Sequence, residues 1–165
     1  MAMVADWADA LDEVEPEEKR RRITRPIDIL SYAGGGNATF TLVGRSSRFT
    51  YRVRLNDDGN LYFVGVLSGS DNNADYSYLG TVRVAEHSRY SHGRKSRVGE
   101  DAPSVKAFAW FWRALVEKDE DALAKVEFWH EGRCGRCGRL LTVPESVERG
   151  IGPECWARMT NGSDD

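Results

Sequence analysis

The chain has 165 residues, enough for one domain or for a domain with a small appendage. Hydrophobic residues make up 41% of it and aromatic residues 10%, a composition that excludes a wholly disordered protein because so much apolar surface can be buried. No long apolar segment occurs, and acidic residues stand where a signal peptide would need basic and then apolar ones. We therefore expect a cytoplasmic protein that does not bind a membrane.

The net charge of −3 conceals an uneven distribution of charge along the chain. Residues 1–18 contain seven acidic residues and no Lys or Arg, whereas residues 19–163 carry 23 basic and 17 acidic residues, a net charge of +6. We expect a disordered acidic arm and glycine-rich linker over residues 1–36, and a disordered tail over residues 159–165. The arm would either be a solvated tail that aids solubility or screen a basic surface by imitating a polyanion.

Alternating apolar and polar residues predict an antiparallel sheet in a body that spans residues 37–125. Over residues 48–55 the odd positions are apolar and the even ones are Arg or Thr, which is typical of a half-buried strand with a basic outer face. Residues 38–43, 61–67 and 78–84 are the other predicted strands, and turn residues separate them. The sequence therefore predicts a four-stranded antiparallel meander.

One main helix is predicted to cover the apolar face of this sheet. Apolar residues recur at helical spacing over residues 104–117, with Asp101 as the predicted cap and Pro103 in the first turn. The aromatic residues 110–112 within it suit core packing better than a cofactor site. Residues 86–99 are expected to form an exposed loop and residues 126–129 a short strand. The predicted fold class is α+β, followed by a small zinc-binding element over residues 126–158.

A compact set of metal-binding residues lies near the C-terminus. Cys134 and Cys137 have the separation that lets both sulfurs approach one ion, and Gly138 permits the backbone angles that turn amides toward thiolates. Cys155 is the predicted third ligand, and His130 is the nearest candidate for the fourth. Thiolates with an imidazole favour tetrahedral zinc, and four protein ligands would close the site, as in structural rather than catalytic zinc sites.

Two alternatives to this ligand set remain open from the sequence. Cys134 and Cys137 could form a redox dithiol, although such a motif normally precedes a helix and this one runs into Gly138. His87 or His92 could replace His130 from the predicted loop. The three cysteines cannot all pair with one another, which favours a metal site in a reducing compartment over a disulfide framework.

The segment from Trp129 to Trp156, above all CGRCGRLLTVPES and RGIGPEC, resembles an uncharacterised family of zinc-ribbon-like domains common in phage and mobile-element proteins. Residues 40–55, 78–82 and 102–112 also resemble the region often joined upstream of that motif, so the resemblance spans residues 37–157. It implies metal ligation by His130, Cys134, Cys137 and Cys155. It implies no reaction, because the role of that family is itself unsettled.

A set of basic residues predicts contact with nucleic acid. Arginines on a pleated surface can reach successive phosphates, and a nearby tyrosine, here Tyr90, can stack on a base, which together suit a single strand. The candidates are Arg48, Arg52, Arg54 and Arg83 on the sheet and Arg89, Arg94, Lys95 and Arg97 on the following loop. The alternative is a solvated outer face, which antiparallel sheets commonly have.

Three functions follow from these features. The first is a noncatalytic phage-type accessory protein with structural zinc that binds nucleic acid through the basic sheet face and loop. The second is a phage-encoded adaptor or inhibitor that binds a host or viral protein. A metal-dependent hydrolase ranks last, because it needs an open metal position and a general base, and Glu131 or Glu154 beside a ligand is not enough. We therefore predict no enzymatic activity and no small-molecule substrate.

Overall fold

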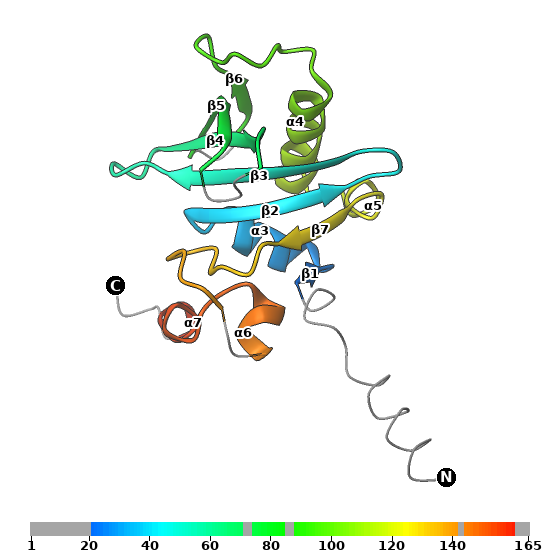
Figure 1. Ribbon diagram of the computed structural model, residues 1–165. Coiled ribbons are helices and arrows are strands. Elements are labelled where there is room, and N and C mark those ends of the chain that lie inside the picture. The colour runs from blue at the N-terminus through cyan, green and yellow to red at the C-terminus, as the bar shows by residue number, and fades with distance from the viewer. Residues whose placement is uncertain (1–20, 71–73, 85–87, 142–143, 161–165) are drawn as a thin grey trace.

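The structure, a computed structural model, describes residues 21–70, 74–84, 88–141 and 144–160. Within these residues seven strands form one antiparallel sheet in the order β1-β7-β2-β3-β4-β5-β6 (Figure 1). The strands are β1 (Arg22–Ile23), β2 (Asn37–Val43), β3 (Arg48–Leu55), β4 (Leu61–Leu67), β5 (Tyr76–Arg83), β6 (Tyr90–His92) and β7 (Glu127–His130). The helices are α3 (Pro26–Ala33), α4 (Pro103–Val116), α5 (Glu120–Leu123), α6 (Pro144–Arg149) and α7 (Pro153–Thr160).

The predicted antiparallel meander is present as the neighbouring strands β2 to β5. The prediction of a four-stranded sheet is wrong, because β1, β6 and β7 extend the sheet to seven strands. Strands β1 and β6 have two and three residues, too few to show an alternating pattern. Strand β7 pairs with β2, which lies far earlier in the sequence, and such a pairing leaves no mark in the local pattern.

Helices α3 and α4 cover one face of the sheet, here called the core face (Figure 1). Phe40 and Tyr51 from the sheet pack there against Phe111 and Phe108 of α4, with ring centroids 5.5 and 5.1 Å apart. All four side chains are fully buried. Because successive residues of a strand point to opposite sides, the residues that alternate with the buried ones form the second face, here called the outer face.

Helix α4 begins at Pro103 and ends at Val116, close to the predicted range. Pro103 takes the first helical position, so the N-cap is Ala102 and not the predicted Asp101. The expected core packing is confirmed for Phe111 and Trp112, which are buried, but residue 110 is an exposed tryptophan. No helix in the described part of the chain is long and apolar enough to cross a lipid bilayer.

The prediction of a disordered segment over residues 1–36 is wrong from residue 22 onward. Strand β1 pairs with β7, and α3 buries Ile29, Tyr32 and Ala33 against the sheet. The acidic residues 1–18 lie outside the described residues, as do residues 161–165 of the predicted tail. The first two residues of that tail, Met159 and Thr160, belong to α7.

The predicted zinc-binding element, residues 126–158, is continuous with the body and not appended to it. Its first strand, β7, lies between β1 and β2 in the sheet. After His130 the chain leaves the sheet toward α6 and α7, which lie at the bottom of the view in Figure 1. A second, small core forms there from Cys134, Leu141, Val147, Ile151 and Cys155. The sheet therefore fixes where this segment begins.

Candidate metal centre and basic sheet face

Three cysteine sulfurs meet after the chain leaves β7. The sulfurs of Cys134, Cys137 and Cys155 all lie within 4.8 Å of one another, and none of the three is in a disulfide. Sulfurs bound to one tetrahedral ion at about 2.3 Å would lie about 3.8 Å apart, so this spacing fits a single ion. Cys134 and Cys155 are buried, whereas Cys137 is exposed. The three cysteines converge as the sequence predicts and could together hold a metal ion.

The chain turns tightly between Cys134 and Gly138. The amide N–H groups of Arg136 and Cys137 donate to Cys134 Sγ, each with an N···S distance of 3.4 Å. Gly138 has a φ of +80°, a left-handed conformation that glycine adopts at little cost, and its N–H donates to the carbonyl of Cys134 at 2.9 Å. The turn therefore has the amide-to-sulfur bonds expected from the spacing of the cysteines and the glycine.

Cys155 approaches the other sulfurs from the first turn of α7, which begins at Pro153. A pocket of about 200 Å³ lies beside the sulfurs and is lined by Cys137 and Cys155 together with Leu140, Pro153 and Glu154. The carboxylate of Glu154 lies 3.3 Å from the guanidinium of Arg139 across this surface, and both side chains are exposed. The cysteine cluster thus lies close to the surface on this side, where Cys137 is exposed.

The surroundings of Cys134 and Cys155 shift the pKa values of these two thiols in opposite directions. Burial would raise the pKa of Cys134, but hydrogen bonds from the amides of Gly152, Cys137 and Arg136 outweigh it and lower the pKa. Burial, together with the neighbouring sulfurs of Cys137 and Cys134, raises the pKa of Cys155 to about 11. A bound divalent cation favours the thiolate form of all three, so metal binding would release protons and strengthen as the pH rises.

His130, predicted from proximity as the fourth ligand, lies outside the group of converging sulfurs. Its Nε2–H donates to the carbonyl of Val147 in α6, and its Nδ1 accepts a hydrogen bond from the N–H of Gly132 at 3.0 Å. Both ring nitrogens are therefore used by the backbone, and neither offers a lone pair to a metal. The structure gives His130 a different role from the predicted one, which is to join β7 to α6.

The buried imidazole of His130 makes the stability of the fold depend on pH. Burial and, to a smaller degree, Arg21 lower the pKa of His130 to about 4 against the opposing effect of the Val147 carbonyl. Because the unfolded chain has the ordinary value of about 6.5, it binds more protons than the folded chain between these pH values. We expect His130→Gln to keep one metal ion per chain, and the stability advantage of the wild type over this variant to shrink by about 2 kcal/mol between pH 7 and pH 5.

Urea unfolding of both proteins at several pH values, with metal content measured in parallel, checks this expectation. Any pH dependence that comes from the cysteines is the same in both proteins. The difference in their free energies of unfolding therefore reports the contribution of His130 alone. Loss of the metal from His130→Gln at pH 7, with the sheet intact by circular dichroism, would restore His130 as a ligand and refute the assignment.

Tyr32 of α3 fastens the cysteine turn to the body. Its hydroxyl lies 2.9 Å from the carbonyl of Thr39 and 3.1 Å from that of Arg133. A Cβ atom at Gly135 or Gly150 would come within 2.6 or 2.7 Å of the Tyr32 ring, so only glycine fits at these two positions. The cysteine turn is thus packed directly against the sheet and its covering helix.

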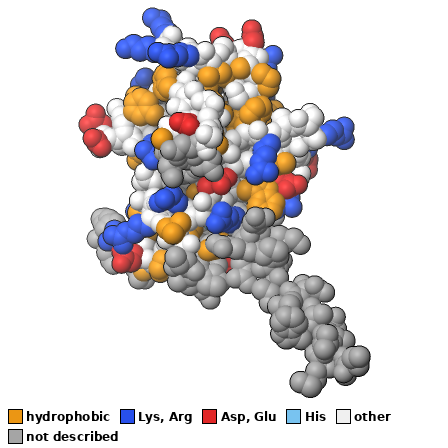
Figure 2. Space-filling model, in the orientation of Figure 1, with side chains coloured by type: hydrophobic (Ala, Val, Ile, Leu, Met, Phe, Trp, Pro, Cys, Tyr) orange, Lys and Arg blue, Asp and Glu red, His pale blue; other side chains and the backbone are white. Residues whose placement is uncertain are grey.

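Arg48, Arg52 and Arg54 lie on the outer face, as predicted, because they alternate along β3 with Tyr51 and Val53, which are buried in the core. Arg83 of β5 is exposed and alternates with a buried valine, which places it on the same face. Figure 2 shows Lys and Arg side chains at several separate places among hydrophobic ones, not as one continuous basic patch. Any ligand of this face would therefore meet apolar groups as well as positive charge.

The predicted basic loop is only partly on this face. Arg94, Lys95 and Arg97 are exposed and follow β6. Ser96 Oγ donates to the carbonyl of Tyr78 at 2.7 Å, and the N–H of Gly93 donates to that of Leu79 at 2.8 Å, so this segment is attached to β5. Arg89, by contrast, lines a pocket with residues of α4, on the side of the sheet that the helix covers.

Tyr90 and His92 do not have the roles that the sequence suggested. The Tyr90 ring packs against Phe108 in the core with centroids 5.4 Å apart, and its hydroxyl bonds to His92 Nδ1 at 2.9 Å, so it is not placed to stack on a base. His92 Nε2 lies 2.9 Å from the carbonyl of Val98, which leaves neither nitrogen for a metal. His87 lies outside the described residues.

Two exposed aromatic residues on the outer face were missed by the sequence analysis. Phe63 of β4 is 46% exposed and Tyr78 of β5 is 38% exposed, and their ring centroids lie 6.4 Å apart. Phe63 pairs with Arg54 across the β3–β4 ladder, and Gly65 lies between Arg52 and Tyr78 in the same way. Because Phe63 is next to Val64 in the strand, the two side chains must point to opposite faces, which could have predicted that Phe63 faces outward. The nearly continuous apolar run over residues 61–67 made both faces look buried.

Comparison with known proteins adds one finding to this geometry. Residues 125–160 match the model of a family described as a family of unknown function, DUF6011. The match covers β7, the three cysteines and α7, and it begins well after residue 37, where the resemblance noted from the sequence starts. Comparisons with curated proteins and with solved structures gave no match.

Proposed function

We propose that this protein binds single-stranded nucleic acid on the outer face of its sheet and that it is not an enzyme. The observation that carries the proposal is the pair of exposed rings, Phe63 and Tyr78, beside Arg52 and Arg54. Aromatic rings on which bases stack, combined with cations that follow the backbone, are the usual means of binding a single strand without strong sequence preference. A solvated face needs no exposed phenylalanine at its centre.

The arrangement across the strands supports this proposal. Arg52 and Arg54 lie on β3, the two rings on β4 and β5, and the basic segment with Arg94 and Lys95 is fastened to Tyr78 at the far side. Neighbouring strands lie about 4.8 Å apart, so this path crosses about 14 Å from β3 to β6. A strand of nucleic acid laid across the sheet would meet cations at both ends of the path and aromatic rings between them.

We further propose that the ion held by the three cysteines is zinc and that its role is structural. Thiolate ligands in a tight turn with amide-to-sulfur bonds suit Zn²⁺. The turn is packed against Tyr32 and follows shortly after β7, which lies between β1 and β2, so the ion would hold part of the body in place. The described residues supply three protein ligands. Binding of Co²⁺ in place of zinc would report the number of thiolates through its charge-transfer absorption.

Binding of a fluorescent single-stranded oligonucleotide at several salt concentrations tests the proposed function. If about five cations contact phosphates, the slope of log K against log salt is about −3.5, and affinity falls about 100-fold between 50 and 200 mM salt. The five we assign are Arg52, Arg54, Arg83, Arg94 and Lys95. Replacing one of them, for example Arg83→Gln, should reduce the slope by about 0.7.

The matched control is Lys106→Gln, because Lys106 is an exposed cation on α4, on the opposite side of the sheet. It should leave both affinity and slope unchanged. Binding that ignores salt, or an equal loss from Lys106→Gln, would refute the assignment of the outer face. A complex with a protein partner that survives nuclease, combined with no affinity of the pure protein for oligonucleotides, would favour the adaptor function instead.

A further inference from the structure

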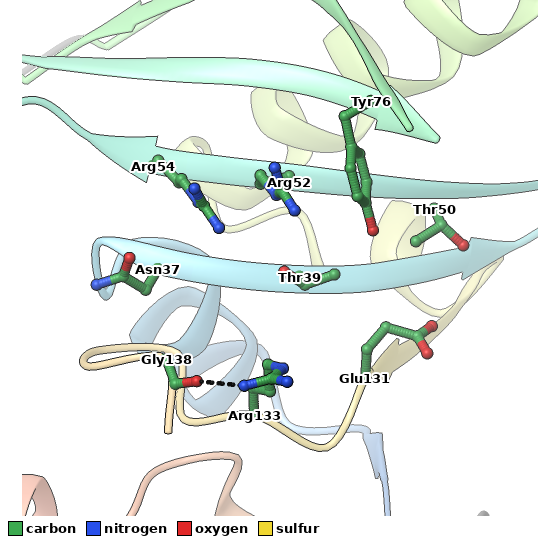
Figure 3. Close-up of a pocket in the computed structure, with 9 residues that line it drawn as sticks. All are labelled: Asn37, Thr39, Thr50, Arg52, Arg54, Tyr76, Glu131, Arg133 and Gly138. Carbon is green, nitrogen blue, oxygen red and sulfur yellow. Dashed lines mark hydrogen bonds between the residues drawn. The ribbon is translucent and has the colours of Figure 1, made fainter. Parts of the chain in front are cut away.

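A pocket of about 340 Å³ lies on the outer face, where β2 and β3 meet the segment after β7 (Figure 3). Arg52 and Arg54 line it from β3, and Arg133 lines it from the other side, beside the cysteine turn. Figure 3 shows Thr39 of β2 between these two walls. Small-molecule sites have volumes of about 300–1,000 Å³, so this pocket can hold one charged group and part of the molecule that carries it.

The charges of the pocket favour a doubly negative ligand. Arg52, Arg54 and Arg133 contribute three positive charges, and Glu131 is the acidic residue in the lining. Figure 3 shows the Glu131 carboxylate at the Thr50 end of the pocket, away from Arg54. There it accepts a hydrogen bond from Thr41 Oγ1, which also lies 2.6 Å from Thr50 Oγ1. A phosphate monoester carries about −1.5 to −2 at neutral pH, which matches the net charge of the lining better than the single charge of a phosphodiester.

Tyr76 provides a second, independent indication of a ligand. Its hydroxyl is buried and has no hydrogen-bond partner among the described residues, and Figure 3 shows it directed into the pocket. Burial raises the pKa of this phenol, so it keeps its proton and is a donor. The guanidinium of Arg52 lies 4.1 Å above the Tyr76 ring. The buried Tyr76 hydroxyl, with the guanidinium of Arg52 above its ring and that of Arg54 in the same pocket, is suited to donate a hydrogen bond to an anionic oxygen.

The two sides of the pocket hold their cations in place. Arg133 donates from Nη1 to the carbonyl of Gly138 at 3.1 Å, so the cysteine turn orients its side chain. Burial, and then repulsion from Arg54, lowers the pKa of Arg52, which an anion between the two groups would reverse. Arg133, and Arg52 through its contact with the Tyr76 ring, are thus held in position before an anion binds.

We infer that this pocket binds a phosphate monoester, the group found at the end of a phosphorylated nucleic-acid strand or on a free nucleotide. Its assignment to a strand end rests on the proposed function. The pocket adjoins Phe63 through Arg54, so a strand whose terminal phosphate lies between Arg54 and Arg133 would place its first bases over the exposed rings. The protein would then favour phosphorylated ends over hydroxyl ends and over the interior of a strand.

The test compares the affinity of the full chain for one oligonucleotide in three forms, with a 5′-phosphate, with a 3′-phosphate and with hydroxyl groups at both ends. Inorganic phosphate and AMP are titrated separately as competitors. We expect one phosphorylated form to bind at least about tenfold more tightly than the hydroxyl form, as charge-assisted hydrogen bonds of this kind provide. Arg54→Gln and Tyr76→Phe should each remove most of this gain.

The matched control is Arg48→Gln, because Arg48 lies on the same strand and the same face but outside the pocket lining, and it should retain the gain. If all three forms bind equally but AMP binds and Arg54→Gln abolishes its binding, the pocket takes a free nucleotide and the strand-end assignment is wrong. If phosphorylation, inorganic phosphate and AMP have no effect while the oligonucleotide still binds, the phosphate pocket is refuted and the proposed function stands. Failure of every oligonucleotide to bind refutes the proposed function. In that case, AMP binding supports the phosphate pocket and its absence refutes the pocket as well.

Discussion

Removal of the metal with a chelator is expected to unfold the cysteine segment and to weaken the sheet as a whole. Zinc contributes about 10–16 kcal/mol in small modules, which is comparable to the stability of an entire domain. The core of this segment consists of Cys134, Leu141, Val147, Ile151 and Cys155, and two of these five are the proposed ligands themselves. Too little apolar surface remains to hold the segment without the ion.

The effect should reach the sheet because the cysteine turn is connected to it directly. Strand β7 lies between β1 and β2, and Tyr32 joins α3 to the turn through Arg133. Hydrogen exchange of the metal-bound and the chelated protein is the measurement. We expect faster exchange of the amides over residues 131–160 and, to a smaller degree, over β7 and β1, with recovery when zinc is returned.

The variant Cys134→Ser should behave like the chelated protein, because a buried serine at this position offers a much weaker ligand for zinc. Cys137→Ser should lose the ion as well, but it should disturb no buried packing, because Cys137 is exposed. A chelated protein with the melting temperature and exchange pattern of the untreated one would show that no structural ion is present.

Removal of the two exposed rings is expected to have the largest effect on nucleic-acid binding. Stacking of a base on an aromatic side chain is worth about 1–3 kcal/mol, so Phe63→Ala and Tyr78→Ala should each weaken binding by about 5- to 150-fold. Their ring centroids are 6.4 Å apart, so they would stack on neighbouring bases, and the double variant should lose more than either single one. Fluorescence anisotropy with a short single strand measures these losses.

Trp110→Ala is the matched control, because Trp110 is an aromatic residue of similar exposure, 39%, on α4. Tyr78→Leu adds a further comparison, since it keeps apolar bulk beside Gly93 but removes the aromatic face. Circular dichroism should show that all variants keep the sheet. Equal affinities for the wild type and the Phe63 and Tyr78 variants would exclude base stacking on this face.

Much of the fold follows from local patterns, and the exceptions have physical causes. The strands β2 to β5 and helix α4 are long enough for a period of two or of 3.6 to be read in their residues. Helix α3 was missed because the glycines after it suggested a linker, yet Ile29 and Tyr32 lie on one buried side of it. Strands β1 and β6 exist through pairing with neighbours, which no short window of sequence reveals.

The candidate site likewise has parts that local sequence determines and parts that depend on contacts between distant segments. The spacing of Cys134 and Cys137 and the glycine that follows them determine the turn by local geometry, so the sequence indicated it. The role of His130 depends on the carbonyl of Val147, which comes near only because the chain folds back through α6. Proximity to the cysteines in sequence therefore predicted a metal ion as the partner of His130, where the structure has a backbone carbonyl. The phosphate pocket joins residues of β2, β3, β5 and the segment after β7, and no motif links such distant positions.

Photocrosslinking of a single-stranded oligonucleotide that carries thio-substituted bases, followed by mass spectrometry, tests the central claim most directly. We predict crosslinks to peptides that contain Phe63 and Tyr78, lost in high salt and reduced by Arg54→Gln. Crosslinks confined to α4 around Trp110, or none at all under conditions where the oligonucleotide is bound, would show that the outer face of the sheet is not the binding surface.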